Sequence, residues 1–342
     1  MPVRIITDSG SEYRPTDHPA LQVLPLTVAF GGETFREGED LSRERFYELL
    51  TERPEHPTTG QVTPFVFGEA IARALEAGDD VVVITMSSVL SGTYQSACIA
   101  AEGLRGKFSG TVRVVDSLNM TLGERIVVEY ALRLLDAGAT ADEIADALEA
   151  NVGRVHIFGL IDTLEYLKRG GRISAAAGAV GELLSIKPVI TVTDGAVEIL
   201  SKARGAKGGR TLLHREISRV GGIDFDMPGA LGYSGSSDKL LRRYLDDYRD
   251  LWEGTIAEDD LPISQVGAAI GCHVGPGGIA VAFFWEGVVT GLFRACDDLM
   301  VSRDSGTLTR KVFIICLERG GHDRPHHHRL RFRLPAGGPS PA

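Results

Sequence analysis

The segment from Val81 to Val115 constrains the fold more than any other part of the chain. An apolar run at Val81–Met86 predicts a buried strand, and the polar residues Ser87–Gly92 predict a loop. Thr93–Leu104 has helical spacing, and Val112–Val115 predicts the next strand. Strand, loop, helix and strand in this order form a βαβ unit with parallel strands and a right-handed crossover. Such sheets bind ligands in the loops beyond the carboxyl ends of their strands, so this loop is a candidate site.

Apolar periodicity and turn residues predict further elements along most of the chain. Strands are predicted at Val3–Asp8, Val155–Ile161, Lys187–Val192, Ala196–Leu200, Gly229–Tyr233, Ile263–Ile270 and Ile279–Phe284. Helices are predicted at Phe65–Ala77, Leu122–Leu135, Ala141–Asn151, Thr163–Lys168, Ser174–Leu184 and Asp238–Trp252. Asp194-Gly195 favours a type I′ hairpin turn, and Thr63-Pro64 is typical of a helix start. The pattern indicates an α/β protein with one α/β domain over residues 1–152, a second over 153–286 and an extension over 287–342.

Charge and cysteine content exclude several classes of protein. Lys and Arg number 36 and Asp and Glu number 46, so the net charge of −10 excludes a globally basic nucleic-acid binder. The 4 cysteines form no C-x-x-C pair, which argues against a zinc ribbon, and scattered cysteines fit a reducing compartment. No signal-peptide pattern and no run of about 18 apolar residues occurs. We therefore expect a cytoplasmic protein without membrane insertion.

The last segment differs in composition from the rest of the chain. Residues 286–342 contain 9 Lys or Arg and 6 Asp or Glu, a net charge of +3. The segment ends in His326-His327-His328, arginines and a tail of Pro, Gly, Ser and Ala. This composition predicts a solvated basic tail with a disordered end. A metal site at the histidine run is the alternative.

Three polar segments contain the candidate binding residues: Thr59-Gly60-Gln61, Ser87–Thr93 and His273–Gly277. The second leads into a helix N-terminus, where exposed N–H groups and the helix dipole favour an anion. Glycine at position 92 allows an anion to approach the backbone closely. Ordinary helix capping by Ser91 or Thr93 is the alternative for this loop. A purely structural role is the alternative for His273.

Cations gather in the segment Asp162–Ser174, which contains Arg172, and continue at Arg204 and Lys207. Arginine recognises carboxylate or phosphate through two parallel hydrogen bonds. The alternative is a solvated basic surface. The sequence contains no phosphate-loop, G-x-G-x-x-G, H-E-x-x-H or G-x-S-x-G motif. A nucleophile–base pair of Ser91 and His273 stays open, although the spacing identifies no third, orienting group.

Seven segments resemble the DegV family of bacterial fatty-acid-binding proteins. In chain order they are IITDSGSE, TGQVTP, SSVLSGTYQSA, VVDS, DTLEYLKRGGRIS, IKPVITVTDGAVE and HVGPGGIAVAFF, spread over residues 3–284. The resemblance implies two α/β domains with one long-chain fatty acid in a tunnel between them, and no cofactor. In members with a kinase partner, the bound acid is presented to that partner, which phosphorylates the carboxylate to an acyl phosphate. The resemblance therefore implies a carrier subunit without catalytic groups of its own.

The same resemblance implies roles for individual residues. Thr59, Ser91 and the amide of Gly92 match the positions that hold the carboxylate, and His273 matches the histidine that completes their hydrogen-bond network. The family usually has serine where this chain has Gly60, which predicts weaker or differently arranged binding of the carboxylate.

Arg172 and Arg204 match the arginines of the head-group and kinase-facing surface. The alternative function is a stand-alone acyl-transfer or hydrolase enzyme that uses Ser91 and His273. A lipid-sensing regulator is a third, although no DNA-binding motif supports it. The sequence does not give the preferred acyl length or unsaturation.

Overall fold

The computed structural model describes residues 2–14, 16–173, 186–252 and 261–285, and these belong to one compact unit. The helix predicted at Ser174–Leu184 falls on residues 174–185, outside the described residues. The extension 287–342, with its histidine run, also lies outside them. The domain boundary predicted after residue 152 lies inside the compact unit, between the helix Ala141–Asn151 and the strand Val155–Leu160. This boundary stays a prediction.

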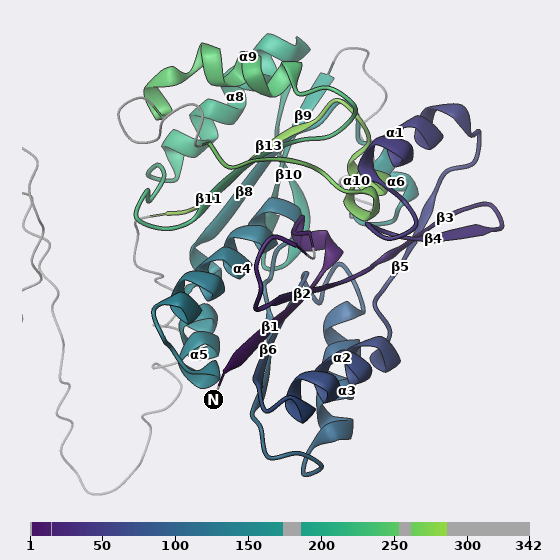
Figure 1. The fold of residues 1–342 in the computed structure, drawn as a ribbon. Coiled ribbons are helices and arrows are strands. Elements are labelled where there is room, and N and C mark those ends of the chain that lie inside the picture. Colours follow the sequence, from purple (N-terminus) through teal and green to yellow (C-terminus); the bar gives the residue numbers. More distant parts are fainter. Residues whose placement is uncertain (1, 15, 174–185, 253–260, 286–342) are drawn as a thin grey trace, which may run out of the picture. The chain divides into compact units, whose positions relative to one another are not determined.

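The first sheet has four parallel strands in the order β2-β1-β6-β7 (Figure 1). Its strands are β1 (Val3–Asp8), β2 (Leu21–Leu24), β6 (Asp80–Thr85) and β7 (Val112–Asp116). The helices α2 (Pro64–Glu76) and α3 (Thr93–Leu104) cover one face, and α4 (Thr121–Asp136) and α5 (Ala141–Asn151) cover the other. Helices on both faces explain why all but one residue of β1 and of β6 are buried. The predicted βαβ unit is confirmed, and the candidate loop follows β6.

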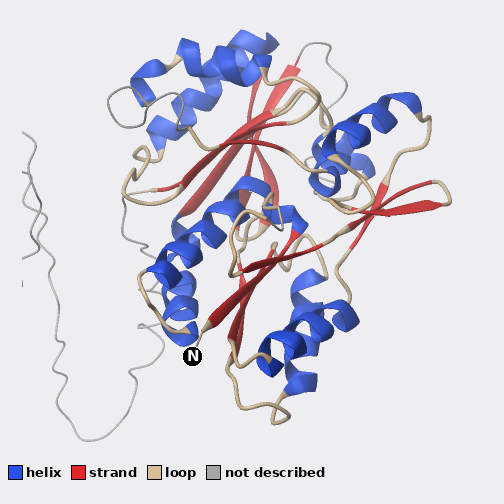
Figure 2. Ribbon diagram, in the orientation of Figure 1, coloured by secondary structure: helices blue, strands red, loops and turns tan. Residues whose placement is uncertain are grey.

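The second sheet has six strands in the order β10-β9-β8-β13-β11-β12 and is antiparallel except between β11 and β12. The strands are β8 (Val155–Leu160), β9 (Ile186–Thr193), β10 (Ala196–Arg204), β11 (Gly229–Tyr233), β12 (Ile263–Gln265) and β13 (Ile279–Phe284). Helices α8 (Gly205–Arg219) and α9 (Lys239–Asp247) pack on this sheet, as Figure 2 shows. Helix α4 contacts strands of both sheets, so it joins the two layers.

A small antiparallel sheet of β4 (Glu33–Arg36), β3 (Thr27–Phe30) and β5 (Thr58–Gly60) lies beside the first sheet. The remaining helices are α1 (Arg43–Glu52), α6 (Glu165–Arg169), α10 (Ala268–Val274) and the short 3-10 turns η1 (Ser9–Ser11), η2 (Val152–Arg154) and η3 (Arg249–Leu251). Strand β5 contains the first predicted polar segment. Helix α10 contacts α1, α6, β3 and β5, so it brings the C-terminal part of the described chain against this small sheet.

Local sequence signals account for several elements. Thr63 caps α2 by accepting a hydrogen bond from the Val66 amide at 3.4 Å, and proline occupies the first helical position. Asp194 and Gly195 have φ values of 47° and 79°, as a type I′ turn requires, and β9 and β10 form the predicted hairpin. Both predictions are confirmed.

Two predicted elements are wrong in extent or type. The strand predicted at Ile263–Ile270 is a strand only at β12, and the following residues form helix α10. The helix predicted at Asp238–Trp252 ends at Asp247, because Tyr248 adopts φ −134° and ψ 47° before η3 begins. His273 therefore lies in the last turn of a helix and not in a loop after a strand.

The side chains of the hydrophobic core form two clusters. One extends from the first sheet through α4 to α10, and the other lies between the second sheet and helices α8 and α9. None of the helices within the described ranges combines the length and the apolar character that a bilayer crossing demands.

Candidate functional site

Two pockets meet at the candidate site. The polar pocket is lined by Leu26, Thr59, Gly60, Gln61, Met86, Leu90, Ser91, Gly92, Met120, Leu167, Arg172, Val197, Ala269, Ile270 and His273. The apolar pocket is lined by Met120, Thr121, Ile157, Gly159, Ile161, Ile190, Thr191, Val192, Tyr233, Ser234, Val266, Ile270, Val274, Gly278, Ile279 and Ala280. Met120 and Ile270 line both pockets, so the two are adjoining parts of one site.

Five of the six predicted site residues line the polar pocket: Thr59, Ser91, Gly92, Arg172 and His273. Arg204 does not appear among the lining residues. Arg204 ends β10, seven residues beyond Val197 of the pocket wall, which is about 23 Å along an extended strand. The structure therefore separates the two predicted arginines.

A hydrogen bond joins Thr59 to His273 across the pocket. The hydroxyl Oγ1 of Thr59 lies 3.0 Å from Nε2 of His273, although the two residues are 214 positions apart. Burial, with the nearby charge of Arg172 as a second cause, lowers the pKa of His273 to about 4. The imidazole is therefore uncharged near neutral pH, with one ring nitrogen that donates and one that accepts.

Glycine at position 170 makes room for this imidazole. A Cβ atom at Gly170, just after α6, would overlap Nδ1 of His273. Nδ1 is buried and has no hydrogen-bond partner among the described residues. A buried ring nitrogen without a partner costs free energy.

The loop after β6 places Ser91 and Gly92 at the N-terminus of α3. Oγ of Ser91 lies 2.8 Å from Oγ1 of Thr93 and accepts the Thr93 amide at 3.2 Å. Gly92 occupies the N-cap position and provides no side-chain cap. Ser91 thus stabilises the first turn, as the capping alternative expects, and it also faces the pocket with a hydroxyl that can donate. Both roles are compatible, because the amide uses a lone pair and leaves the O–H proton free.

Gln61 is a site residue that the sequence reasoning missed. Its Nε2 donates to Oγ of Ser96 on α3 at 2.7 Å, and its Oε1 occupies the place that a Cβ at Gly92 would need. The side chain therefore connects the Thr59 segment to the helix that begins after Gly92. Its position next to Gly60 in a polar segment was the only available signal.

The close contact with Thr27 accounts for the glycine at position 60 in this chain. Gly60 pairs with Thr27 across β5 and β3, and a Cβ at Gly60 would overlap Oγ1 of Thr27. A serine at this position requires Thr27 to change its side-chain rotamer. Thr27 itself is not part of the pocket lining.

Arg172 is exposed at the edge of the polar pocket. Its guanidinium donates to the carbonyl oxygen of Gly170 at 2.7 Å and to that of Leu90 at 3.4 Å. Among the lining residues of this pocket Arg172 alone carries a permanent charge. Charge recognition inside the pocket therefore depends on uncharged donors, with one arginine at the rim.

His56 is a second histidine near the site that the sequence reasoning did not select. Its ring packs against Tyr166 with centroids 5.9 Å apart, and its charge affects the pKa of His273. Burial lowers the pKa of His56, and the nearby Arg169 lowers it further. Both histidines are therefore neutral near pH 7.

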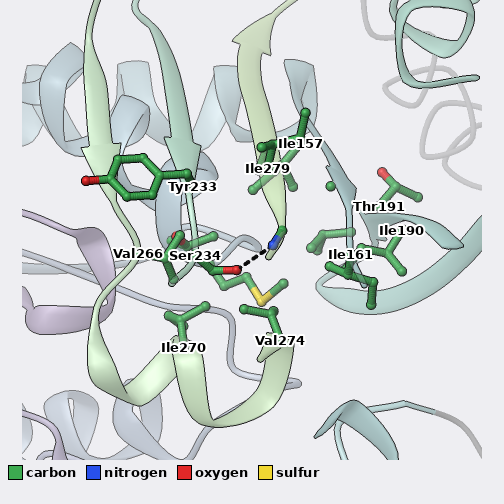
Figure 3. A pocket seen from close by; sticks show the side chains of 16 residues that line it. Ile157, Ile161, Ile190, Thr191, Tyr233, Ser234, Val266, Ile270, Val274 and Ile279 are labelled. Carbon is green, nitrogen blue, oxygen red and sulfur yellow. Dashed lines mark hydrogen bonds between the residues drawn. The ribbon is translucent and has the colours of Figure 1, made fainter. Parts of the chain in front are cut away.

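The cavity in the apolar pocket measures about 40 Å³, below the usual range of ligand pockets of about 300–1,000 Å³, whereas the cavity in the polar pocket measures about 300 Å³. Figure 3 shows Ile270 and Val274 of α10 facing Ile161 and Ile190 across it. The polar atoms of Ser234 and Gly278 satisfy each other, because the Gly278 amide donates to Oγ of Ser234 at 2.8 Å. The lining offers van der Waals contact and few free polar groups, which suits an aliphatic group.

The nucleophile–base alternative gains no geometric support. Oγ of Ser91 is hydrogen-bonded to Thr93, and Nε2 of His273 is hydrogen-bonded to Thr59. No described side chain orients the other ring nitrogen of His273. The described part of the chain also contains no group of three or more His, Cys, Asp or Glu side chains arranged to hold a metal ion.

Comparison with known proteins gives the following relatives. A family model described as "Uncharacterised protein, DegV family COG1307" matches residues 2–286. A DegV domain-containing protein of Deinococcus radiodurans is 34% identical over 289 residues, which cover 82% of this chain and 98% of the relative. A solved structure described as "Fatty Acid Binding of a DegV family Protein from Thermus thermophilus" has a TM-score of 0.72 and 30% identity, and the match covers 83% of this chain and 100% of that one.

A third similar structure shows the fold alone, because its sequence identity is 23%. It is the Streptococcus pneumoniae Fatty Acid Kinase (Fak) B3 protein loaded with linoleic acid. Its TM-score is 0.73, and the match covers 84% of this chain and 100% of that one.

Proposed function

This chain belongs to the DegV family, and from that premise we propose that it binds one long-chain fatty acid and presents the carboxylate to a partner kinase. The observation that carries the proposal is the junction of a polar pocket and an apolar pocket at Met120 and Ile270. A fatty acid has the same two-part character. The fatty-acid binding named for the Thermus thermophilus relative supports the proposal.

The apolar pocket accounts for the affinity. Burial of a methylene group contributes about 0.8 kcal/mol, so a chain of about 14 to 16 methylenes contributes on the order of 10 kcal/mol before entropic costs. The side chains of Ile270 and Val274 and the wall opposite them supply this apolar surface, and they move apart in the proposed complex, because the cavity between them measures about 40 Å³. Chain length preference then depends on how far the pocket extends from the junction.

The polar pocket accounts for the orientation of the ligand. An unpaired carboxylate in a buried site costs several kcal/mol, so it needs donors. In the proposed complex the hydroxyls of Thr59 and Ser91 and the amide of Gly92 donate to the carboxylate, and the neutral His273 completes the set through Thr59. Without a buried cation, the carboxylate keeps its negative charge and its nucleophilicity.

The phosphorylation step follows from this arrangement. A carboxylate oxygen attacks the terminal phosphoryl group of a nucleoside triphosphate held by the partner kinase. The new bond joins that oxygen to phosphorus, and the bond from phosphorus to the leaving nucleoside diphosphate breaks. This chain holds the acid and supplies no catalytic group. A cytoplasmic location, where nucleoside triphosphates are abundant, is part of the proposal.

The first test is identification of the bound lipid. We expect native mass spectrometry of gently purified protein to show an added mass of one fatty acid that disappears after denaturation. Chromatography of the extract then identifies the acid. Covalent acylation of Ser91, retained after denaturation, would instead support the acyl-transfer enzyme. Protein that neither retains nor rebinds any fatty acid contradicts the proposal.

The two arginines test the presentation step. Arg172 lies at the rim of the polar pocket, and Arg204 lies at the far end of β10. We expect Arg172→Ala and Arg204→Ala to lower phosphorylation by a partner kinase at least tenfold and to leave fatty-acid affinity within about twofold, since neither donates to the buried carboxylate. Lys202→Ala, which changes another exposed cation of β10, is the matched control. Equal loss of binding and phosphorylation contradicts this division of roles.

A further inference from the structure

Four buried carboxyl groups lie behind the polar pocket: Asp8, Glu12, Glu37 and Glu124. Each is at most 7% exposed. Only one cation forms an ion pair with any of them among the described residues, since Nη2 of Arg43 lies 3.1 Å from Oε2 of Glu12. Four like charges with one counterion cannot all be ionised in a buried site, so the cluster holds protons. We call these four residues the acid network.

Glu12 connects three elements around the site. Its Oε1 accepts from Oγ1 of Thr121 at 2.8 Å, and Thr121 begins α4 and lines the apolar pocket. Its Oε2 accepts from the amide of Gly267 at 2.8 Å, and Gly267 is the N-cap of α10. Through Arg43 it also contacts α1. One carboxyl group therefore fixes the starts of the two helices that carry Met120 and Ile270.

Glu37 makes a second contact with the N-terminal end of α10. Its Oε1 accepts from the amide of Ala269 at 3.2 Å, and Ala269 lines the polar pocket. Its Oε2 accepts from Oγ of Ser9 at 2.7 Å, and the same Oγ accepts from the amide of Leu26 at 3.0 Å. Leu26 is also a lining residue. A carboxylate at the N-terminus of a helix also interacts favourably with the helix dipole.

Asp8 fixes the opposite wall and shares a proton. Its Oδ2 accepts from the amide of Met86 at 3.0 Å, which is the first residue of the loop that leads to Ser91. Its carboxyl group lies near that of Glu124, since a Cβ atom at Gly10 would lie 2.8 Å from Oδ1 of Asp8 and 3.4 Å from Oε2 of Glu124. Two carboxylates have no donor between them, so one of the pair carries a proton. Oε2 of Glu124, buried and without a hydrogen-bond partner among the described residues, is the site for it.

We propose that the acid network links fatty-acid binding to protons: Asp8, Glu12 and Glu37 lie one hydrogen bond behind residues that line the pockets, so loss of network protons places negative charge near the bound carboxylate and weakens fatty-acid binding. The inference rests on the proposed function. It follows from contacts, because Asp8, Glu12 and Glu37 each accept a hydrogen bond from a residue that lines one of the pockets, namely Met86, Thr121 and Ala269. A bound carboxylate adds negative charge beside the network and favours its protonated form, so binding takes up protons.

The direction of the pKa changes agrees with this arrangement. Burial is the largest cause, and it raises the pKa of Asp8 to about 6 and the pKa of Glu12 to about 7. Burial likewise raises the pKa of Glu37 and of Glu124. Protons are therefore bound below about pH 6 and leave as the pH rises through 7 and beyond.

Other charged or titratable groups face the network from the elements packed against it. They are Arg43 and Tyr47 on α1, Arg125 on α4 and Cys272 on α10. Arginine stays protonated throughout the pH range of interest, and burial raises the pKa of both Tyr47 and Cys272 far above neutrality. Asp8 and Glu12 are therefore the groups of this cluster whose pKa values, about 6 and about 7, lie near neutrality.

The test measures fatty-acid affinity against pH. We expect the affinity of the unmodified protein to fall roughly fivefold or more from pH 6 to pH 8, within the limit of about tenfold per pH unit for each linked proton. Glu12→Gln, which keeps an oxygen acceptor but cannot ionise, is expected to flatten this profile by at least half. Glu44→Gln, an exposed residue next to Arg43, is the matched control and keeps the profile. The acid is used as monomer, below its aggregation concentration.

Calorimetry of the unmodified protein provides a second readout that needs no variant. Titrations at pH 7 in phosphate and in Tris, which differ in ionisation enthalpy, report the protons taken up on binding, and we expect a clear fraction of one proton. Equal affinity at pH 6 and 8 without proton uptake overturns this inference and leaves the proposed function intact. A protein that binds no fatty acid at any pH overturns both. A purely structural role of Glu12 predicts loss of stability in Glu12→Gln with an unchanged pH profile.

Discussion

The polar pocket is assembled from loops and helix ends that lie far apart in the sequence, whereas the apolar pocket is lined mainly by neighbouring strands of one sheet. In the polar pocket the hydrogen bond between Thr59 and His273 joins residues 214 positions apart. In the apolar pocket Ile157, Ile190 and Ala280 come from the adjacent strands β8, β9 and β13. Strand alternation alone directs such side chains to one face.

Because of this difference, the two pockets are sensitive to different kinds of substitution. The polar pocket depends on close approach, since Gly92 and Gly170 leave room for Gln61 and His273. Hydrogen bonds require distances within a few tenths of an ångström, so small displacements matter there. The apolar pocket depends on volume, because apolar contact has no directional requirement. Changes in volume and changes in donors should therefore have separable effects.

The largest expected effect comes from filling the apolar pocket. Ala280 on β13 lines it, and Ala280→Phe occupies space that the acyl chain needs. Exclusion of about four methylenes costs about 3 kcal/mol, so the affinity for a long-chain acid should fall more than about 100-fold. Isothermal titration with acids of increasing length measures this change.

A short acid is the control for this variant, because its tail leaves the rest of the pocket empty. Ala280→Val should give an intermediate loss for long acids. If Ala280→Phe weakens short and long acids equally, the acyl chain does not occupy this pocket and the comparison between the two pockets fails.

The next effect concerns a single donor of the polar pocket. Ser91→Ala removes a charge-assisted hydrogen bond to the carboxylate and should weaken binding by about 1–3 kcal/mol, independently of acyl length. Ser88→Ala, an exposed serine of the same loop outside the pocket lining, is the matched control. An affinity unchanged in Ser91→Ala would place the carboxylate elsewhere.

His273 of the polar pocket affects how the free energy of unfolding depends on pH. The pKa of His273 is lowered to about 4 from a usual value near 6.5, so the folded protein binds fewer protons than the unfolded chain between these values. The contribution of this residue to the free energy of unfolding is therefore present above pH 6.5 and is lost as the pH falls toward 4. His273→Asn should remove a fall on the order of 1–3 kcal/mol across this window.

Urea unfolding at pH 7 and at pH 4.5 measures the change for the unmodified protein and the variant. The acid network has the opposite dependence, because its raised pKa values favour the folded state at low pH. Only the difference between variant and unmodified protein isolates His273. A difference that does not depend on pH contradicts the assignment of a neutral imidazole.

The sequence predicted the local elements of the fold and one wall of the polar pocket. The loop with Ser91 and Gly92 follows from the βαβ pattern, because it continues from the carboxyl end of β6. Helix α5 at Ala141–Asn151 has its predicted bounds. Such elements depend on neighbours along the chain, so a local pattern is sufficient.

The rest depends on contacts between distant residues. The apolar run before His273 is short and fits a strand or a helix equally well. Two carboxyl groups decide in favour of α10: Glu12 accepts from an amide 255 positions away and Glu37 from one 232 positions away. The proximity of Thr59 and His273 was implied only by the family resemblance. No local signal indicated the acid network, and the polar segment around Gly60 was the only signal for Gln61.

The smallest expected effect, at Gly60, tests whether a donor added to the polar pocket strengthens it. Gly60 does not have a positive φ, so serine is allowed by the backbone, but its Cβ would overlap Oγ1 of Thr27. Gly60→Ser alone should lower the free energy of unfolding by about 1 kcal/mol, because Thr27 must change its rotamer. It should alter the affinity for fatty acid less than about fivefold, since one hydrogen bond contributes about 1 kcal/mol. Thr27→Ala combined with Gly60→Ser removes the overlap and should recover the stability. Thermal unfolding and titration of the single and double variants separate the two effects. A double variant that recovers stability without any gain in affinity would mean that the existing donors already satisfy the carboxylate, so that only the apolar pocket leaves room for tighter binding.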